Sequence, residues 1–133
     1  MKKWRPMLCT CVIEQHADWS GGKSIISSCP AHAHITDPQT LYETCLQESR
    51  RAMNVLRRIE DGLPAVYDLT LDGEGVLIGR QFKPGRDVHF SYGTSPSDRT
   101  LHVHIAGFRT NELNAVRGFA SILAVSDGPI VVE

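Results

Sequence analysis

The fold is decided at two short stretches, Cys9-Thr10-Cys11 and Cys29-Pro30-Ala31-His32. Structural zinc sites usually take two ligands from each of two turns, and each stretch supplies one such pair of side chains. The Cys-x-x-His spacing is typical of a zinc-binding turn, whereas Cys-x-Cys is tighter than the usual Cys-x-x-Cys. We therefore expect a structural Zn²⁺ ion bound by Cys9, Cys11, Cys29 and His32.

Other interpretations of these side chains stay open from the sequence alone. His34 is close enough in the chain to replace His32, and Cys45 could approach from a later segment, although its position suits core packing. The cysteines could also pack without a ligand, form a disulfide, or hold an iron–sulfur cluster, which usually has cysteine in place of histidine. A metal with four protein ligands has no open position for water, so its expected role is structural.

Length and composition limit the class of protein. The chain has 133 residues, enough for one ordinary domain or for a small metal-bound lobe joined to a modest second core. Its 14 basic and 15 acidic residues nearly balance, so there is no global attraction to nucleic acid or membrane. Residues 1–8 lack the apolar run of a secretory signal, and no stretch approaches a membrane span. We expect a reducing cytoplasm, where thiolates stay available to metals.

The order of the expected elements predicts an α+β fold. Residues 1–36 are expected to form a zinc-binding hairpin lobe, because two strand-like runs flank a glycine-containing turn at residues 18–22. Residues 37–62 are expected to form a connecting amphipathic helix, and residues 65–133 a small α+β domain with a mainly antiparallel sheet and a second helix. The predicted boundary is Gly62–Ala65, and all three segments could also pack as one compact domain.

Local signals place the elements within these segments. Asp37-Pro38 supplies an N-cap and a first helical proline, and Gly62-Leu63-Pro64 ends the long helix. The second helix is expected to begin after a cap at Thr110 or Asn111. Alternation and turn residues predict strands at residues 12–14, 23–27, 66–71, 76–78, 87–92, 100–106 and 130–132.

Basic residues form a stripe on the polar side of the predicted long helix. The stripe consists of Arg50, Arg51, Arg57 and Arg58. A phosphate backbone or another partner could bind it, although arginines on a solvated helix face give the same pattern.

The stretch Leu101-His102-Val103-His104-Ile105 alternates aliphatic residues with histidines. In a strand, both histidines therefore project from one face. Two aligned imidazoles can bind a metal or relay protons, and His89 on a neighbouring strand can join them only if the register permits. A half-exposed sheet face that happens to carry two histidines is the alternative.

The opening of the chain resembles a group of known proteins. Trp4–Glu14, followed by Cys29-Pro30-Ala31-His32, is similar to the opening of small uncharacterised proteins encoded by tailed bacteriophages. The segment Glu48–Asn54 is also similar to theirs. The resemblance covers about the first half of the chain, and it implies a phage origin and a metal-binding opening but no activity.

The sequence carries no recognisable catalytic motif, because its glycine-rich stretches lack a strand-to-helix context and no serine lies in a nucleophile-elbow pattern. We therefore expect no enzymatic activity. A non-enzymatic structural or assembly component of a phage virion fits best, acting through interfaces with other virion proteins in an oligomeric assembly. The alternatives are a nucleic-acid-binding accessory protein in the host cytoplasm and a small inhibitor of a host protein. We expect no membrane partner.

Overall fold

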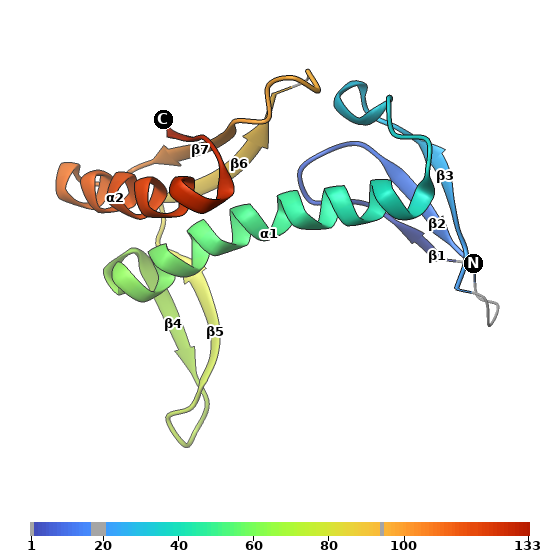
Figure 1. Ribbon diagram of the computed structural model, residues 1–133. Coiled ribbons are helices and arrows are strands. Elements are labelled where there is room, and N and C mark those ends of the chain that lie inside the picture. The colour runs from blue at the N-terminus through green and yellow to red at the C-terminus, as the bar shows by residue number, and fades with distance from the viewer. Residues whose placement is uncertain (1, 17–20, 94) are drawn as a thin grey trace. The chain divides into compact units, whose positions relative to one another are not determined.

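The structure, a computed structural model, describes residues 2–16, 21–93 and 95–133. Its two α-helices and three small sheets confirm the predicted α+β class (Figure 1). Neither helix in the described residues combines the length and the apolar character needed to cross a membrane.

The chain divides into two compact units. The first consists of Met1–Met53 and Ser91–Leu101, and the second consists of Asn54–Phe90 and His102–Glu133. The division passes through the long helix α1 (Pro38–Gly62), whereas the sequence placed a boundary after that helix.

The first unit begins with a three-stranded antiparallel sheet in the order β1-β2-β3. It contains β1 (Lys2–Trp4), β2 (Val12–Gln15) and β3 (Lys23–Ser27). The predicted pairing of β2 with β3 is confirmed, while the predicted turn at residues 18–22 falls largely outside the described residues. The sequence did not predict β1, because three residues beginning with two lysines carry no alternating apolar pattern.

A buried cluster packs this sheet against the start of α1. It contains Cys11, Ile13, Cys29, Ala31, Leu41 and Cys45. Leu41 points inward because α1 begins as predicted: Asp37 Oδ2 accepts a hydrogen bond of 2.8 Å from the Thr40 N–H. Ile13 and Leu41 are both fully buried, and each contributes about 1.5 to 3 kcal/mol to folding by leaving water.

The other strands and the second helix follow in the predicted order. They are β4 (Tyr67–Leu71), β5 (Leu77–Phe82), β6 (Asp87–Tyr92), β7 (Leu101–Ala106), α2 (Thr110–Asp127) and β8 (Ile130–Val132). β4 and β5 form an antiparallel hairpin, and β5 extends beyond its predicted end because Arg80 and Gln81 pair with β4 despite their polarity. A short 3-10 helix, η2 (Pro64–Val66), leads into β4.

The predicted cap of α2 is wrong. The N-cap is Arg109, and Glu112 reaches back to accept the Arg109 N–H at 2.8 Å. The carboxylate at the third helical position thus satisfies the backbone donor of the N-cap, which is one half of a capping box, while arginine has no side-chain acceptor to supply the other half.

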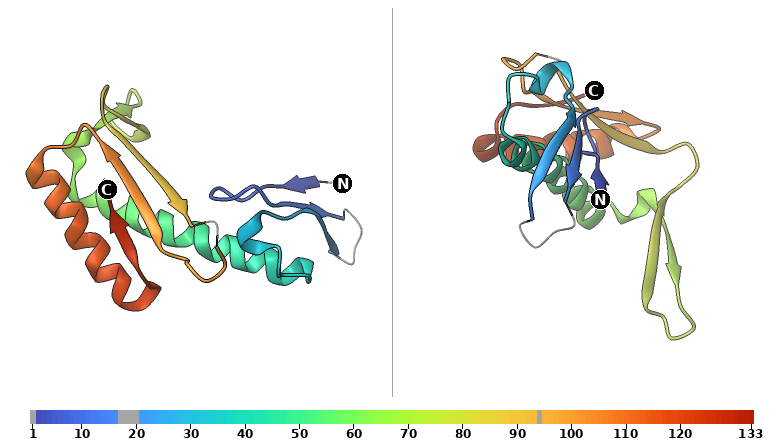
Figure 2. Two further views of the ribbon diagram at one scale, coloured as in Figure 1. Left: turned by 90° about the horizontal axis from the view of Figure 1, so that it is seen from above. Right: turned by 90° about the vertical axis from the view of Figure 1, so that its right-hand side faces the viewer.

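β6, β7 and β8 form a sheet in that order, and β6 runs antiparallel to β7 (Figure 2). The Glu133 N–H donates to the Val103 carbonyl at 2.8 Å, and the Ile105 N–H donates to the Glu133 carbonyl at 3.0 Å. These two bonds bracket His104, which is the pattern of a parallel pair, so β7, α2 and β8 form a β–α–β unit. The predicted alternation of β7 is confirmed: Leu101 and Val103 are fully buried, whereas His102 and His104 are half-exposed.

Candidate metal centre

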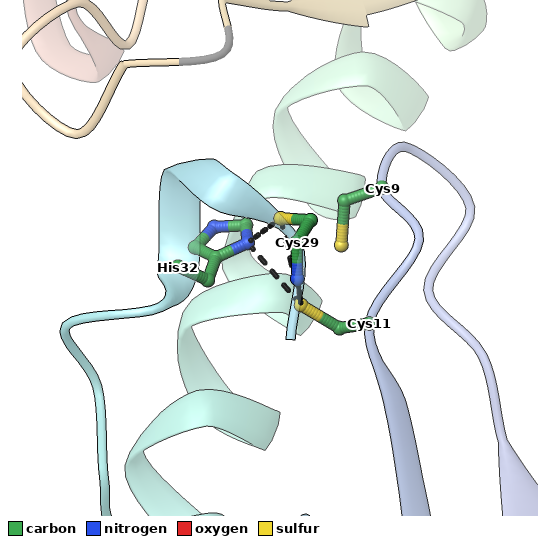
Figure 3. Close-up of side chains that lie close together, drawn as sticks. All are labelled: Cys9, Cys11, Cys29 and His32. Atoms are coloured by element: carbon green, nitrogen blue, oxygen red, sulfur yellow. Dashed lines mark hydrogen bonds between the residues drawn. The ribbon is translucent and has the colours of Figure 1, made fainter. Parts of the chain in front are cut away.

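Four ligand side chains meet where the three-stranded sheet faces α1 (Figure 3). Cys9 and Cys11 lie on the chain that leads into β2, Cys29 follows β3, and His32 ends the short 3-10 helix η1 (Pro30–His32). The antiparallel pairing of β2 with β3 brings the two halves together: Val12 pairs with Ser27 at one end of the hairpin, and just beyond this pair the Cys29 N–H reaches Cys11 Sγ. All four ligand atoms lie within 4.8 Å of one another, so the predicted quartet can hold a metal ion.

The closest three donors form a tight triangle. Cys11 Sγ lies 3.6 Å from both Cys29 Sγ and His32 Nδ1, and Cys29 Sγ lies 3.0 Å from His32 Nδ1. The Cys29 N–H also donates to Cys11 Sγ at 3.3 Å. A sulfur separation of 3.6 Å is far beyond the bond length of about 2.05 Å in a disulfide, so these cysteines are free thiols.

Burial and hydrogen bonding both favour the protonated form of the thiols. Cys11 is fully buried, and this burial raises the pKa of its thiol to about 12. The hydrogen bond with Cys45, together with burial, also raises the pKa of Cys9 well above its ordinary value. Both thiols are therefore protonated at neutral pH without a metal, and a metal ion must displace those protons, which makes binding dependent on pH.

A carboxylate holds His32 from its other side. The Nδ1 atom of His32 faces the sulfurs, while its Nε2 atom lies 3.2 Å from Oε1 of Glu48 on α1. Histidines that bind metals usually donate their second ring N–H to a carboxylate, which fixes the tautomer and the ring orientation. Glu48 therefore orients His32 with Nδ1 available to a metal.

Arg99 in turn fixes Glu48. Its Nη2 lies 2.6 Å from Glu48 Oε2, its Nε donates to Oε1 at 3.1 Å, and its Nη1 donates to the Gly93 carbonyl at 2.8 Å. The guanidinium also lies 4.5 Å from the centre of the Tyr92 ring. Sequence reasoning missed Glu48 and Arg99 because no motif links such distant positions. The available signal was that Glu48 follows the core-facing Cys45 by three residues on one helix.

The two alternative ligands, His34 and Cys45, lie outside the quartet. His34 is exposed and lies outside the cluster, so His32 is the histidine of this site. Cys45 is buried on α1 with its Sγ 3.8 Å from Cys9 Sγ, beside the quartet. A pocket of about 290 Å³ lies beside the cluster and is lined by Cys9, Cys29 and Arg99 among others.

Three of the four arginines in the predicted stripe are exposed to solvent, and the fourth is half-buried. Arg50, Arg57 and Arg58 are exposed. Arg51 is half-buried, since its Nη1 donates to the Arg99 carbonyl at 3.2 Å and its guanidinium lies 5.5 Å from the Tyr92 ring centre. Arg51 therefore supports the segment that carries Arg99.

No protein-family model, curated protein or solved structure matches this chain. The chemistry of the centre is therefore inferred from its donor atoms and their spacing. Three thiols and one imidazole form a donor set suited to borderline and soft metals, and the burial of Cys11, Cys29 and His32 shields the position they surround from solvent.

Proposed function

We propose that Cys9, Cys11, Cys29 and His32 bind one structural Zn²⁺ ion. With Zn–S distances of about 2.3 Å and Zn–N distances of about 2.0 Å, a zinc tetrahedron has S–S edges of about 3.8 Å and S–N edges of about 3.6 Å. Cys11 Sγ lies 3.6 Å from Cys29 Sγ and 3.6 Å from His32 Nδ1, close to both edges, whereas the 3.0 Å between Cys29 Sγ and His32 Nδ1 must lengthen by about 0.5 Å when the ion binds. Because four protein atoms fill the coordination shell, the ion would stabilise the fold and leave no position for a reacting water.

The proposed role of the protein is non-enzymatic and depends on protein–protein contacts. The observation that carries it is the hairpin β4–β5, a two-stranded sheet whose strands pair only with each other in the described part of the chain. Large apolar side chains lie exposed along it, which is characteristic of an interaction surface. These side chains are Leu69, Leu71, Val76, Leu77 and Ile78.

We place this role in the assembly of a phage particle, with other virion proteins as partners and the virion or host cytoplasm as location. Our reason for that setting is the resemblance of Trp4–Glu14 and Glu48–Asn54 to tailed-phage proteins that we infer from the sequence. A balanced charge also suits contacts with proteins better than contacts with nucleic acid.

Substitutions in the hairpin test the interaction role. Wild-type protein is expected to co-sediment with assembled particles of the phage that encodes it, while the double variant Leu71→Lys, Ile78→Lys is not. Val125→Lys is the matched control, because Val125 is 89% exposed but lies on α2. Equal retention of all three proteins, or of none, contradicts the proposal.

Nucleic-acid binding is a second candidate, favoured by the exposure of Arg50, Arg57 and Arg58 along α1. If it holds, retention on DNA falls steeply with salt, and Arg50→Glu combined with Arg57→Glu abolishes it. Retention that the double variant leaves unchanged rules this candidate out.

A further inference from the structure

A second cluster of metal-binding side chains lies on the sheet β6-β7-β8. It consists of the imidazoles of His89, His102 and His104, which come from β6 and β7. The ring centres of His89 and His104 are 4.8 Å apart, and those of His102 and His104 are 6.2 Å apart. The register therefore does bring His89 to the pair that alternation placed on one face of β7.

Each ring of this histidine cluster has a carboxylate at its Nδ1 atom. Glu133 bridges two rings: its Oε1 lies 2.8 Å from Nδ1 of His102, and its Oε2 lies 3.1 Å from Nδ1 of His104. Asp87 Oδ2 lies 3.0 Å from Nδ1 of His89. The backbone bonds of Glu133 to Val103 and Ile105 hold the bridging carboxylate beside β7.

We propose that this histidine cluster binds one divalent transition-metal ion of the Zn²⁺, Ni²⁺ or Cu²⁺ class. Histidines that bind metals through one ring nitrogen usually donate the other to a carboxylate, and here every Nδ1 has that partner. The metal is therefore bound through Nε2, and Glu133 and Asp87 orient the rings. Imidazole nitrogen suits this class of ion, whereas Mg²⁺ and Ca²⁺ prefer oxygen ligands.

The centre-to-centre distance of one pair of rings matches that of two imidazoles on one metal ion. When two imidazoles bind one metal at about 2.0 Å, their ring centres lie about 4.5 to 5.2 Å apart at octahedral or tetrahedral angles. His89 and His104 already have such a separation at 4.8 Å, but their planes differ by only 17°, so one ring must turn before both Nε2 atoms point at one ion. His102, whose ring centre is 6.2 Å from that of His104, must also approach by a side-chain rotation. Side-chain exposures of 66% for His89 and 29% for His102 leave room for that rotation.

This site differs in kind from the thiol centre and does not depend on it. Its ligands are nitrogen atoms on a half-exposed surface, so the ion exchanges with solvent, whereas the Cys9, Cys11, Cys29 and His32 quartet is largely buried and rich in sulfur. Following the order of stability for nitrogen ligands, the histidine cluster binds Cu²⁺ and Ni²⁺ more tightly than Co²⁺.

Calorimetric titration of untagged, full-length protein with Ni²⁺ tests the proposal. We expect one Ni²⁺ per chain, released by imidazole, without the near-ultraviolet absorption of a nickel–thiolate bond. His102→Asn combined with His104→Asn is expected to weaken binding at least tenfold, and Glu133→Gln by about tenfold or more. His34→Asn, at an exposed histidine outside both clusters, leaves the affinity unchanged.

Nuclear magnetic resonance locates the ion independently of any variant. Bound Ni²⁺ is expected to broaden the imidazole signals of His89, His102 and His104 before those of His34. If the double variant loses its circular dichroism spectrum, the exposed single variant His89→Asn replaces it in the titration. Absence of Ni²⁺ binding, affinity unchanged by these substitutions, or broadening centred elsewhere overturns the proposal.

Discussion

The Nε2 atom of His32 lies 3.2 Å from Oε1 of Glu48, a residue on a different element of the same unit. This contact joins the turn that carries His32 to α1, and Arg99 extends it to the segment before β7. The cluster of Cys9, Cys11, Cys29 and His32 is therefore connected through side-chain contacts to α1 and to the segment before β7.

Glu48→Gln tests this connection. The amide keeps the shape of the side chain but loses its charge, so it orients His32 less firmly, and we expect zinc affinity to fall about 10- to 100-fold. Glu43→Gln is the control, since Glu43 lies exposed on the same helix. Competition with a chromophoric chelator measures both affinities, and equal values for the two variants would remove Glu48 from the site.

Two pairs of substitutions identify the ligands. His32→Ala is expected to lose zinc and loosen the first unit, while His34→Ala retains the metal because its ring lies outside the cluster. Likewise Cys9→Ala loses zinc and Cys45→Ala keeps it. Metal analysis and hydrogen exchange report on both effects. Loss of zinc from Cys45→Ala alone would mean that Cys45 binds the ion in place of Cys9.

Glu112 predicts a pH dependence of the second unit. Its carboxylate accepts the Arg109 N–H and lies 2.6 Å from Arg86 Nη1, and the Arg109 bond is the main cause that lowers the pKa of Glu112. A lowered pKa in the folded state means that the stabilisation is present above the ordinary carboxyl pKa and is lost as pH falls through the lowered value.

The matched variants Glu112→Gln and Glu112→Ala separate charge from capping. Glutamine can still accept the Arg109 N–H, so we expect it to cost about 1 kcal/mol at neutral pH, and alanine about 2 to 3 kcal/mol. Urea unfolding across the acidic range measures both. In the glutamine variant, the free energy of unfolding should fall less between neutral and acidic pH than it does in wild type. An identical pH profile would contradict this role.

Gly107 is required where the chain turns after β7. Its φ is +77°, and a Cβ atom there would overlap the Gly85 carbonyl oxygen. We therefore expect Gly107→Ala to destabilise the protein by about 3 kcal/mol or more, through a backbone clash. Gly118→Ala is the control: nothing lies within 4 Å of its Cβ position on α2, so helix propensity should stabilise it by about 1 kcal/mol. Thermal melting distinguishes the two, and similar melting temperatures would be inconsistent with the clash.

The sequence predicted the features that depend on local pattern. Helical spacing and the Asp37 cap located α1, and the paired cysteine turns identified a cluster that can hold a metal. It could not predict β1, whose three residues form a strand only because β2 offers an edge. It also missed Glu48 and Arg99, since their roles arise from tertiary contacts between residues 51 positions apart.

The position of Glu133 was equally beyond a local pattern. It lies beside His104 only because α2 returns the chain to β7, and no spacing along the sequence encodes that approach. The choice between His32 and His34 likewise depended on the conformation of η1, which buries His32 and leaves His34 exposed.

Metal content of the purified, untagged protein tests the central claim most directly. Native mass spectrometry after dialysis against a weak chelator is expected to find one zinc ion per chain, retained until acid denaturation protonates the thiolates. A metal-free protein with the same fold, whose Cys11 and Cys29 react freely with an alkylating reagent only on unfolding, would contradict the account and leave the cysteines as core packing.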